Sequence, residues 1–373
     1  KSLVQTVLLK RGLHSYEEAV RVLMEKQWPT EAKQKGIVHL FYASSLYDYY
    51  YNYSWEINQR EKVSSKKEVD LKKWAANDIF EEINRQYFYA YQFSEEFEKL
   101  SVKNFPDYVK RGNYPDNIRE NLYEFLIYQW VNFLNDTNTW KPIELKEKYQ
   151  LDFALFKNEP EKRKLLEDSK YLIDSNVHPV MKSVHLLDNL YFWCLKKEKI
   201  EAALESQITR IKKLSYIFDK KEQTQALFES FSELLPKYEK YEWWSVGKYE
   251  QAMLLHKLGS LKDAHKIATE GYNKYPKSAG GKQCFDLIKM IEIPYFDVKS
   301  MLIDRIGTKS IEISHKNIKK LYFRAYKINF NTVFDRQYTY FGHIDSSFIK
   351  DIIRKEKYYS SWEAQIDDKG DYL

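Results

Sequence analysis

Cysteine is rare in this sequence, whose 373 residues include only Cys194 and Cys284. Two cysteines are too few for a scaffold of several disulfides, and neither has the closely spaced Cys or His neighbours of a zinc site. Both lie in apolar stretches with helical periodicity. We therefore expect two buried free thiols, and a single disulfide between them is the alternative.

Clusters of one charge and long apolar runs are also missing. The 60 basic and 54 acidic residues give a net charge of +6 and are interspersed along the chain. Nucleic-acid-binding proteins gather basic residues on one face, so we expect no nucleic-acid partner. The apolar runs are too short to cross a membrane, so we expect no membrane span. The sequence starts at Lys1 without a visible signal peptide, which is consistent with a processed or trimmed chain.

No catalytic motif stands out. The eight histidines are scattered, and neither a His-Glu-x-x-His nor a Gly-x-Ser-x-Gly pattern occurs. His178 and His185 could share a helix face, but no carboxylate completes a metal site, so we interpret them as structural. The segment Gly280-Gly281-Lys282-Gln283 lacks the first glycine and the Ser or Thr of a phosphate-binding loop, so we predict a helix entry there. We expect no catalytic, cofactor-binding or metal-binding residue, and no enzyme activity.

What the sequence does contain is a dense mixture of apolar and charged residues. Hydrophobic residues make up 43% and charged residues 31%, which is the balance of a folded globular protein. Aromatic residues reach 16%, and 31 of them are tyrosines. Because tyrosine combines an apolar ring with a polar hydroxyl, we expect most of them at seams between helices.

Helical periodicity dominates the first 293 residues. The predicted helices are 4–9, 16–26, 36–53, 70–99, 117–134, 161–172, 178–197, 200–218, 222–235 and 280–293, with an irregular stretch over 140–160. Ser15 and Glu18 have the spacing of a capping box at the start of the second helix. Helix 117–134 is apolar on most sides, which predicts a central and buried position.

Residues 246–276 contain the clearest repeat-like unit. Gly259, Leu261, Ala264, Gly271 and Pro276 have the spacing of the turn glycine, large apolar residue, small packing residues and final proline of a tetratricopeptide repeat. Small residues let two helices cross closely, and glycine permits the tight turn between them. Degenerate versions lie at 12–19 and 199–203. We therefore predict a tetratricopeptide-like α-helical array.

After residue 293 the period of the pattern changes to two. This predicts strands at 298–303, 309–314, 319–328 and 362–366, with a short helix near 347–355. The predicted fold is mainly α, with a helical repeat domain over 1–293 followed by a small β-sandwich over 294–373. Three or four strands are few for a β-sandwich, so we expect this β-rich domain to be incomplete.

An aromatic block over 47–55 has two interpretations. Exposed Tyr and Trp side chains can stack on sugars or bases, and Tyr50, Tyr53 and Trp55 are the candidates for such a partner-binding surface. Tyrosines at helical spacing can also pack between helices, and we favour this structural interpretation.

Several segments, in their order along the chain, resemble the N-terminal region of bacterial alpha-2-macroglobulin family proteins of the Bacteroidetes type. They are YYYNYSWEINQR (49–60), the apolar helix 117–134, His178-Pro179-Val180, AGGKQC (279–284), NIKKLYFRAY (317–326), and Trp362 with Asp371-Tyr372. The resemblance implies that the helix after residue 276 leads into a first macroglobulin-like domain. It also implies that other macroglobulin domains of the same chain are partners.

The same resemblance implies a non-catalytic N-terminal module of a large envelope protein that traps proteases, either periplasmic or an outer-membrane lipoprotein. Proteases or envelope proteins are then further partners. The sequence has no Cys-x-Glu-Gln thioester motif, so no reactive residue of the family can be assigned. Two alternatives stay open, a glycan-binding outer-membrane lipoprotein of the nutrient-uptake type and a general tetratricopeptide protein-interaction module. A helical hydrolase would need a pocket that brings histidine and carboxylate groups together.

Overall fold

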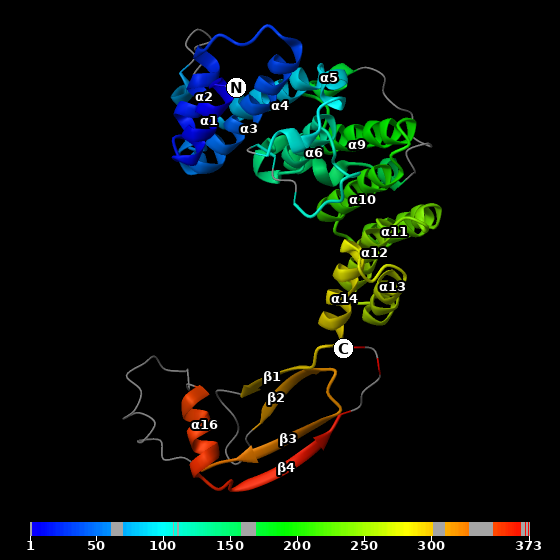
Figure 1. The fold of residues 1–373 in the computed structure, drawn as a ribbon. Coiled ribbons are helices and arrows are strands. Elements are labelled where there is room, and N and C mark those ends of the chain that lie inside the picture. Colours follow the sequence, from blue (N-terminus) through cyan, green and yellow to red (C-terminus); the bar gives the residue numbers. More distant parts are fainter. Residues whose placement is uncertain are drawn as a thin grey trace.

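The computed structural model describes residues 2–60, 70–106, 108–109, 112–157, 169–300, 310–327, 346–366, 370 and 372. These residues are mainly helical, and a small antiparallel β region follows the helices (Figure 1). The helices pack one after another in a repeat-like array, and the strands lie beyond the last helix of this array. The predicted order of a helical array and then strands is confirmed.

Most helices of the array lie close to predicted positions. The helices are α1 (Ser2–Gly12), α2 (Tyr16–Glu25), α3 (Ala32–Ile57), α4 (Ala76–Tyr91), α5 (Ser94–Glu98), α6 (Leu122–Leu134), α7 (Pro142–Glu147), α8 (Ala154–Lys157), α9 (Pro179–Lys196), α10 (Ile200–Ile217), α11 (Lys221–Leu234), α12 (Trp244–Lys257), α13 (Leu261–Lys274) and α14 (Ala279–Glu292). However, α7 and α8 lie in the stretch 140–160 that was expected to be irregular, and α6 begins five residues later than predicted. Short 3-10 helices lie between them at η1 (Leu71–Lys73), η2 (Val102–Asn104), η3 (Thr137–Thr139), η4 (Lys148–Gln150), η6 (Ser169–Leu172) and η7 (Leu235–Tyr238).

Two local predictions were wrong. The single helix expected over 70–99 is divided into η1, α4 and α5. The last break lies at Phe93 (φ −103°, ψ 24°), which packs against Gly36 of α3, where any larger residue would collide with it. The capping box is not formed either, because the Ser15 side chain makes no cap bond and Glu18 pairs with Lys10. Most of the helix expected over 161–172 lies outside the described residues.

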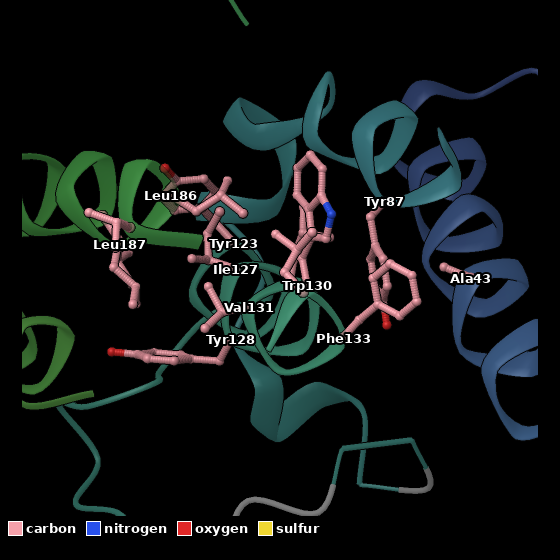
Figure 2. Packing of buried hydrophobic residues seen from close by; sticks show 14 of the residues in the cluster. Ala43, Tyr87, Tyr123, Ile127, Tyr128, Trp130, Val131, Phe133, Leu186 and Leu187 are labelled. Carbon is pink, nitrogen blue, oxygen red and sulfur yellow. The ribbon is translucent and has the colours of Figure 1, made fainter. Parts of the chain in front are cut away.

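Helix α6 is the central helix of the main core, as its apolar sequence predicts. Figure 2 shows it between α9 on one side and α3 on the other, with Tyr87 of α4 facing Trp130 and Phe133. The rings of Tyr87 and Trp130 are nearly parallel, with centroids 6.1 Å apart. Trp130 is fully buried, and its Nε1 donates to Asn84 Oδ1 at 2.8 Å. The core therefore buries an indole without leaving its N–H unpaired.

Glycine positions allow α12, α13 and α14 to pack closely together. Gly259 makes the turn between α12 and α13 at φ +78°, as the repeat pattern predicts. A Cβ atom on Gly280 would lie 2.2 Å from the backbone nitrogen of Val246, so α14 crosses α12 almost backbone to backbone. Cys284 is buried in the same cluster, and both it and Cys194 are free thiols. The expected pair of buried free thiols is confirmed.

The β region consists of two antiparallel hairpins. Strand β1 (Tyr295–Ser300) pairs with β2 (Ile311–Lys316), and β3 (Lys320–Ala325) pairs with β4 (Ser360–Gln365). The expected helix near 347–355 is confirmed as α16 (Ser346–Lys355). The first strand begins earlier than predicted, at Tyr295, and 301–309 lie outside the described residues. The described residues form two separate sheets of two strands, and the β-sandwich stays a prediction.

A hydrogen-bonded joint connects α14 to the β region. Asn317, between β2 and β3 at φ 56°, donates from Nδ2 to the carbonyls of Ile291 at 2.7 Å and Ile293 at 3.3 Å. Carbonyls at a helix C-terminus have no donor within the helix, so this side chain satisfies them. Near the other end of the region, Tyr372 stacks on His265 of α13 with ring centroids 4.9 Å apart.

Candidate partner-binding surfaces

The structure separates the three aromatic residues that were candidates for one surface, all of which lie on α3. Tyr50 is only 4% exposed, its hydroxyl donates to the carbonyl of Asn138 at 3.0 Å, and its ring meets Phe80 edge-on. Tyr53 is half-buried, whereas Trp55 is 80% exposed. Tyr50 therefore has a structural role, and a platform made of all three side chains is excluded.

The exposed aromatic pair of this helix is Tyr51 and Trp55. Tyr51 is 56% exposed, and α3 is kinked between the two at Tyr53 (φ −118°, ψ 18°). The sequence gives no clear signal for this pair, because five of the seven residues from 47 to 53 are tyrosines and no helical face is distinct. Each of these exposed rings offers a small contact surface.

A groove runs between α11 and α13, with side chains of α12 between them. Its volume is about 760 Å³. Phe228 and Phe231 of α11 and Ile267 of α13 supply apolar walls, and Trp244 of α12 lies among them. This groove belongs to the repeat-like unit, where stacked helices form the surfaces that solenoid proteins use for binding.

Charges of both signs surround Trp244 in this groove. Lys248 and Lys274 place their ammonium groups 5.1 and 5.5 Å from its ring centroid. Lys248 pairs with Glu270 at 2.8 Å, and Lys274 pairs with Glu239 at 2.5 Å. The hydrogen bond from Lys274 lowers the pKa of Glu239 from its ordinary value. Trp244 itself is only 6% exposed, so the paired charges and the half-buried Phe228 and Ile267 are the groups that a peptide can contact.

The β region carries apolar side chains that the described part of the chain does not bury. From Glu292 onward, none of the residues whose burial is described is buried. The exposed large apolar residues are Ile293, Tyr295, Phe296, Val298, Ile311, Tyr322, Ile349, Ile353, Tyr358, Tyr359 and Trp362. They lie on both hairpins, on α16 and beside them (Figure 1). Extensive exposed apolar surface of this kind marks a site of contact with another surface.

No catalytic constellation is assembled in the ranges that the structure describes. His178 caps α9, because its Nδ1 accepts from the N–H of Val180 at 3.2 Å while its Nε2 lies 3.0 Å from the carbonyl of Glu144. This arrangement requires the neutral Nε2–H tautomer. Burial lowers the pKa of both His178 and His185 from the ordinary value. In the same ranges no group of three His, Cys, Asp or Glu could hold a metal ion.

The glycines at the start of α14 are packing residues. Ser278 caps the helix and its Oγ accepts from the N–H of Gly281 at 2.9 Å. A Cβ atom on Gly281 would lie 1.9 Å from the carbonyl oxygen of Tyr275. The predicted helix entry is confirmed, and close packing accounts for the glycine at 281.

Comparisons with known proteins found no relative. No family model matches this chain, and no similar curated protein or solved structure was found. Among the described helices, none is long and apolar enough to cross a membrane. Inferences about function therefore rest on the surfaces of the chain itself.

Proposed function

We propose that this chain is a non-catalytic scaffold and partner-binding module whose β region docks onto a neighbouring β domain. The observation that carries the proposal is the contrast in burial between the two parts. The helical array has an extensive apolar core, whereas no described residue after Ile291 is buried. Burial of one large apolar side chain contributes roughly 1.5–3 kcal/mol, so a second apolar surface would stabilise the hairpins considerably.

Strand pairing supports a β domain as the partner. Each sheet in the described ranges has two strands, and a two-stranded hairpin is marginally stable by itself in water. Its outer strands also present unpaired N–H and C=O groups to any strand that approaches. A partner with its own sheet can satisfy both needs, because it brings an apolar face and a strand edge together.

The partner in this proposal is a macroglobulin-like domain of the same polypeptide. The whole protein would then be an envelope protein of the alpha-2-macroglobulin type that traps proteases. Support comes from the segments 279–284 and 317–326, whose sequences resemble that family. The first begins α14, and the second is bonded through Asn317 to the C-terminal end of the same helix. Asn317 belongs to the second segment and caps α14, which gives this residue of the pattern a structural role.

Hydrogen exchange on a longer product of the same gene tests the docking proposal. We would sequence the gene beyond the codon for Leu373 and express the chain with whatever domains follow. Amides around Tyr322 and Trp362 should exchange at least about tenfold more slowly in the longer protein than in residues 1–373 alone. Amides around Leu287 in α14 serve as the control and should be equally protected in both. A stop codon after Leu373, or equal exchange at the hairpins, would refute the proposal.

Protease trapping is tested on the same longer protein. A protease enclosed by a trap keeps its activity on a small peptide substrate and loses its activity on a large protein substrate. We expect this split after incubation with the longer protein and no effect from residues 1–373 alone. Equal loss on both substrates would indicate active-site inhibition instead, and no loss on either would exclude trapping.

Peptide binding in the α11–α13 groove is the second candidate function. The aromatic and charged lining of this groove favours it. Peptides selected from a displayed library against the chain should lose affinity about tenfold when Lys274→Glu replaces a groove charge. Lys196→Glu, on the exposed side of α9, is the matched control. Peptides that bind both variants and the wild type equally would exclude the groove as their site.

A further inference from the structure

Lys182 is a buried lysine without a partner. It lies in the first turns of α9 and is only 6% exposed. Among the described residues, no hydrogen bond or ion pair reaches its Nζ. The other buried charged residues of the described ranges are all ion-paired. The pairs are Glu124 with Lys199, Glu205 with Arg119, and Asp188 with Arg210. A charge on a largely buried side chain is unfavourable without a partner, so this exception requires an explanation.

Lys182 lines a cavity of about 400 Å³ between α4, the end of α6, α7 and the start of α9. The deep part of this cavity is apolar and buried, and its walls are Phe80, Phe133, Leu134 and Trp140. The mouth is polar, because the side chains of Glu81 and Arg85 there are 48% and 50% exposed. The cavity therefore has an aromatic interior, one buried ammonium group and a charged entrance.

The carboxylates near this cavity have other partners. Glu81 pairs with Lys141 at 2.8 Å, and Glu144 accepts from the backbone N–H of Lys141 at 2.6 Å. Asp174 accepts from the backbone N–H of residue 176 at 2.9 Å. No carboxylate of the described ranges forms an ion pair or hydrogen bond with Lys182, although Glu144, Asp174 and Glu81 lie near enough to favour its charged form. The positive end of the α9 dipole also lies at this side of the cavity, which further favours an anion.

We infer that this cavity binds an organic carboxylate, with Lys182 Nζ as the donor to the carboxylate and the aromatic walls around an apolar or aromatic body. The volume is that of pockets for small ligands. A carboxylate fits better than a phosphate, because one deep ammonium group can balance one negative charge. The chemistry is shared by free small acids and by the C-terminal residue of a peptide. The site lies within the helical array, so it is independent of the function proposed for the β region.

Binding of matched acids and amides tests this inference. Phenylacetate and hexanoate are compared with phenylacetamide and hexanamide by isothermal titration calorimetry on the whole chain. We expect the acids to bind at least about tenfold more tightly than their amides, because only the acids pair with the ammonium group. Lys182→Met should lose this preference, and Lys196→Met on the exposed side of α9 should keep it.

The wild-type comparison of acid and amide needs no variant, and Lys182→Gln is a second neutral replacement if the Met variant does not fold. Equal affinity of acid and amide, undiminished binding by a folded neutral variant, or no binding by any acid would overturn the inference. Peptides ending in phenylalanine, with a free or an amidated C-terminus, separate the two sources. Tighter binding of the free-terminus peptide than of phenylacetate supports a peptide ligand, and binding of the small acids alone supports a free acid.

Discussion

Replacing Lys182 by methionine is expected to stabilise the folded chain near neutral pH. The wild-type side chain holds a positive charge in the wall of a cavity and has no partner among the described residues. Methionine has a similar length, is flexible and is buried without a charge to desolvate. Most substitutions of buried residues destabilise a protein, so the expected sign separates this explanation from ordinary loss of packing.

The magnitude follows from the pKa of this lysine. Burial lowers the pKa of Lys182 from 10.5 to about 8; Glu144, Asp174 and Glu81 oppose this shift, and Lys141 adds to it. The unfolded chain therefore binds more protons than the folded chain between these two values, and the free energy of unfolding rises with pH in that window. Below the lower value the penalty is complete, at about 3 kcal/mol. Near pH 9.5 only about 1 kcal/mol of it remains.

Urea unfolding followed by tryptophan fluorescence at pH 7 and pH 9.5 measures this effect. The difference in unfolding free energy between Lys182→Met and the wild type should shrink by about 2 kcal/mol from the lower to the higher pH. Lys196→Met on the exposed side of α9 should differ from the wild type by less than about 0.5 kcal/mol at both. Titrations of tyrosines and other lysines are common to all three proteins and cancel in these differences. A Lys182→Met difference that does not change with pH would refute the unpaired buried charge.

Other parts of the array give three further predictions. Glu205→Gln should lower the free energy of unfolding by about 2 kcal/mol in a urea series, because it leaves the half-buried partner Arg119 without the counter-ion of this buried pair. Gly280→Ala should cost more than about 2 kcal/mol in the same assay because of its backbone collision, whereas Gly12→Ala, with open space around it, should change stability by less than about 1 kcal/mol. Both cysteines should react with Ellman's reagent only when urea unfolds the chain, since burial raises the pKa of both thiols, that of Cys284 to about 12.

Helix positions could be predicted because the signals for them are local. Apolar spacing along one face and a turn glycine such as Gly259 act within a few residues. They predicted the repeat-like unit over 246–276, which forms α12 and α13, and the bounds of α14 to within one residue. The break between α4 and α5 could not be predicted, because its setting is a contact between Phe93 and Gly36 on another helix. The pairing of the strands could not be predicted either, because alternation of apolar and polar residues identifies a strand but not the strand with which it pairs.

The candidate sites depend even more on contacts between distant segments. Lys182 and Glu205 lie on mainly apolar helices, where a charged residue normally indicates the exposed side. Packing of α4 and α7 beside α9 buries the first, and the loop that carries Arg119 buries the second. For Tyr50 the sequence did suffice, because this residue is buried as the structural interpretation of the aromatic block predicts. The same interpretation does not describe Trp55, which is exposed.

The two parts of the chain differ in what stabilises them. In the array, even a charged loop residue is enclosed: Arg119 lies between the rings of Tyr114 and Tyr128, at 4.1 and 3.7 Å, and pairs with Glu205 at 2.6 Å. The hairpins have complete ladders of strand pairs but no buried residue in the described ranges. Because a hydrogen bond contributes only about 1 kcal/mol net, the ladders without apolar burial give the hairpins little stability of their own.

A partner that covers the hairpins would therefore stabilise them selectively. A partner that binds one folded part of a chain raises the free energy of unfolding of that part. The increase grows with the logarithm of the ratio of the partner concentration to the dissociation constant. The bonds from Asn317 to the end of α14 join the hairpins to a helix that is already packed against α12 and α13. Urea unfolding of the chain alone should then show two transitions, with the hairpins lost first. Addition of the partner should raise the urea midpoint of the first transition and leave that of the second unchanged. A single transition whose midpoint rises as a whole would contradict this separation.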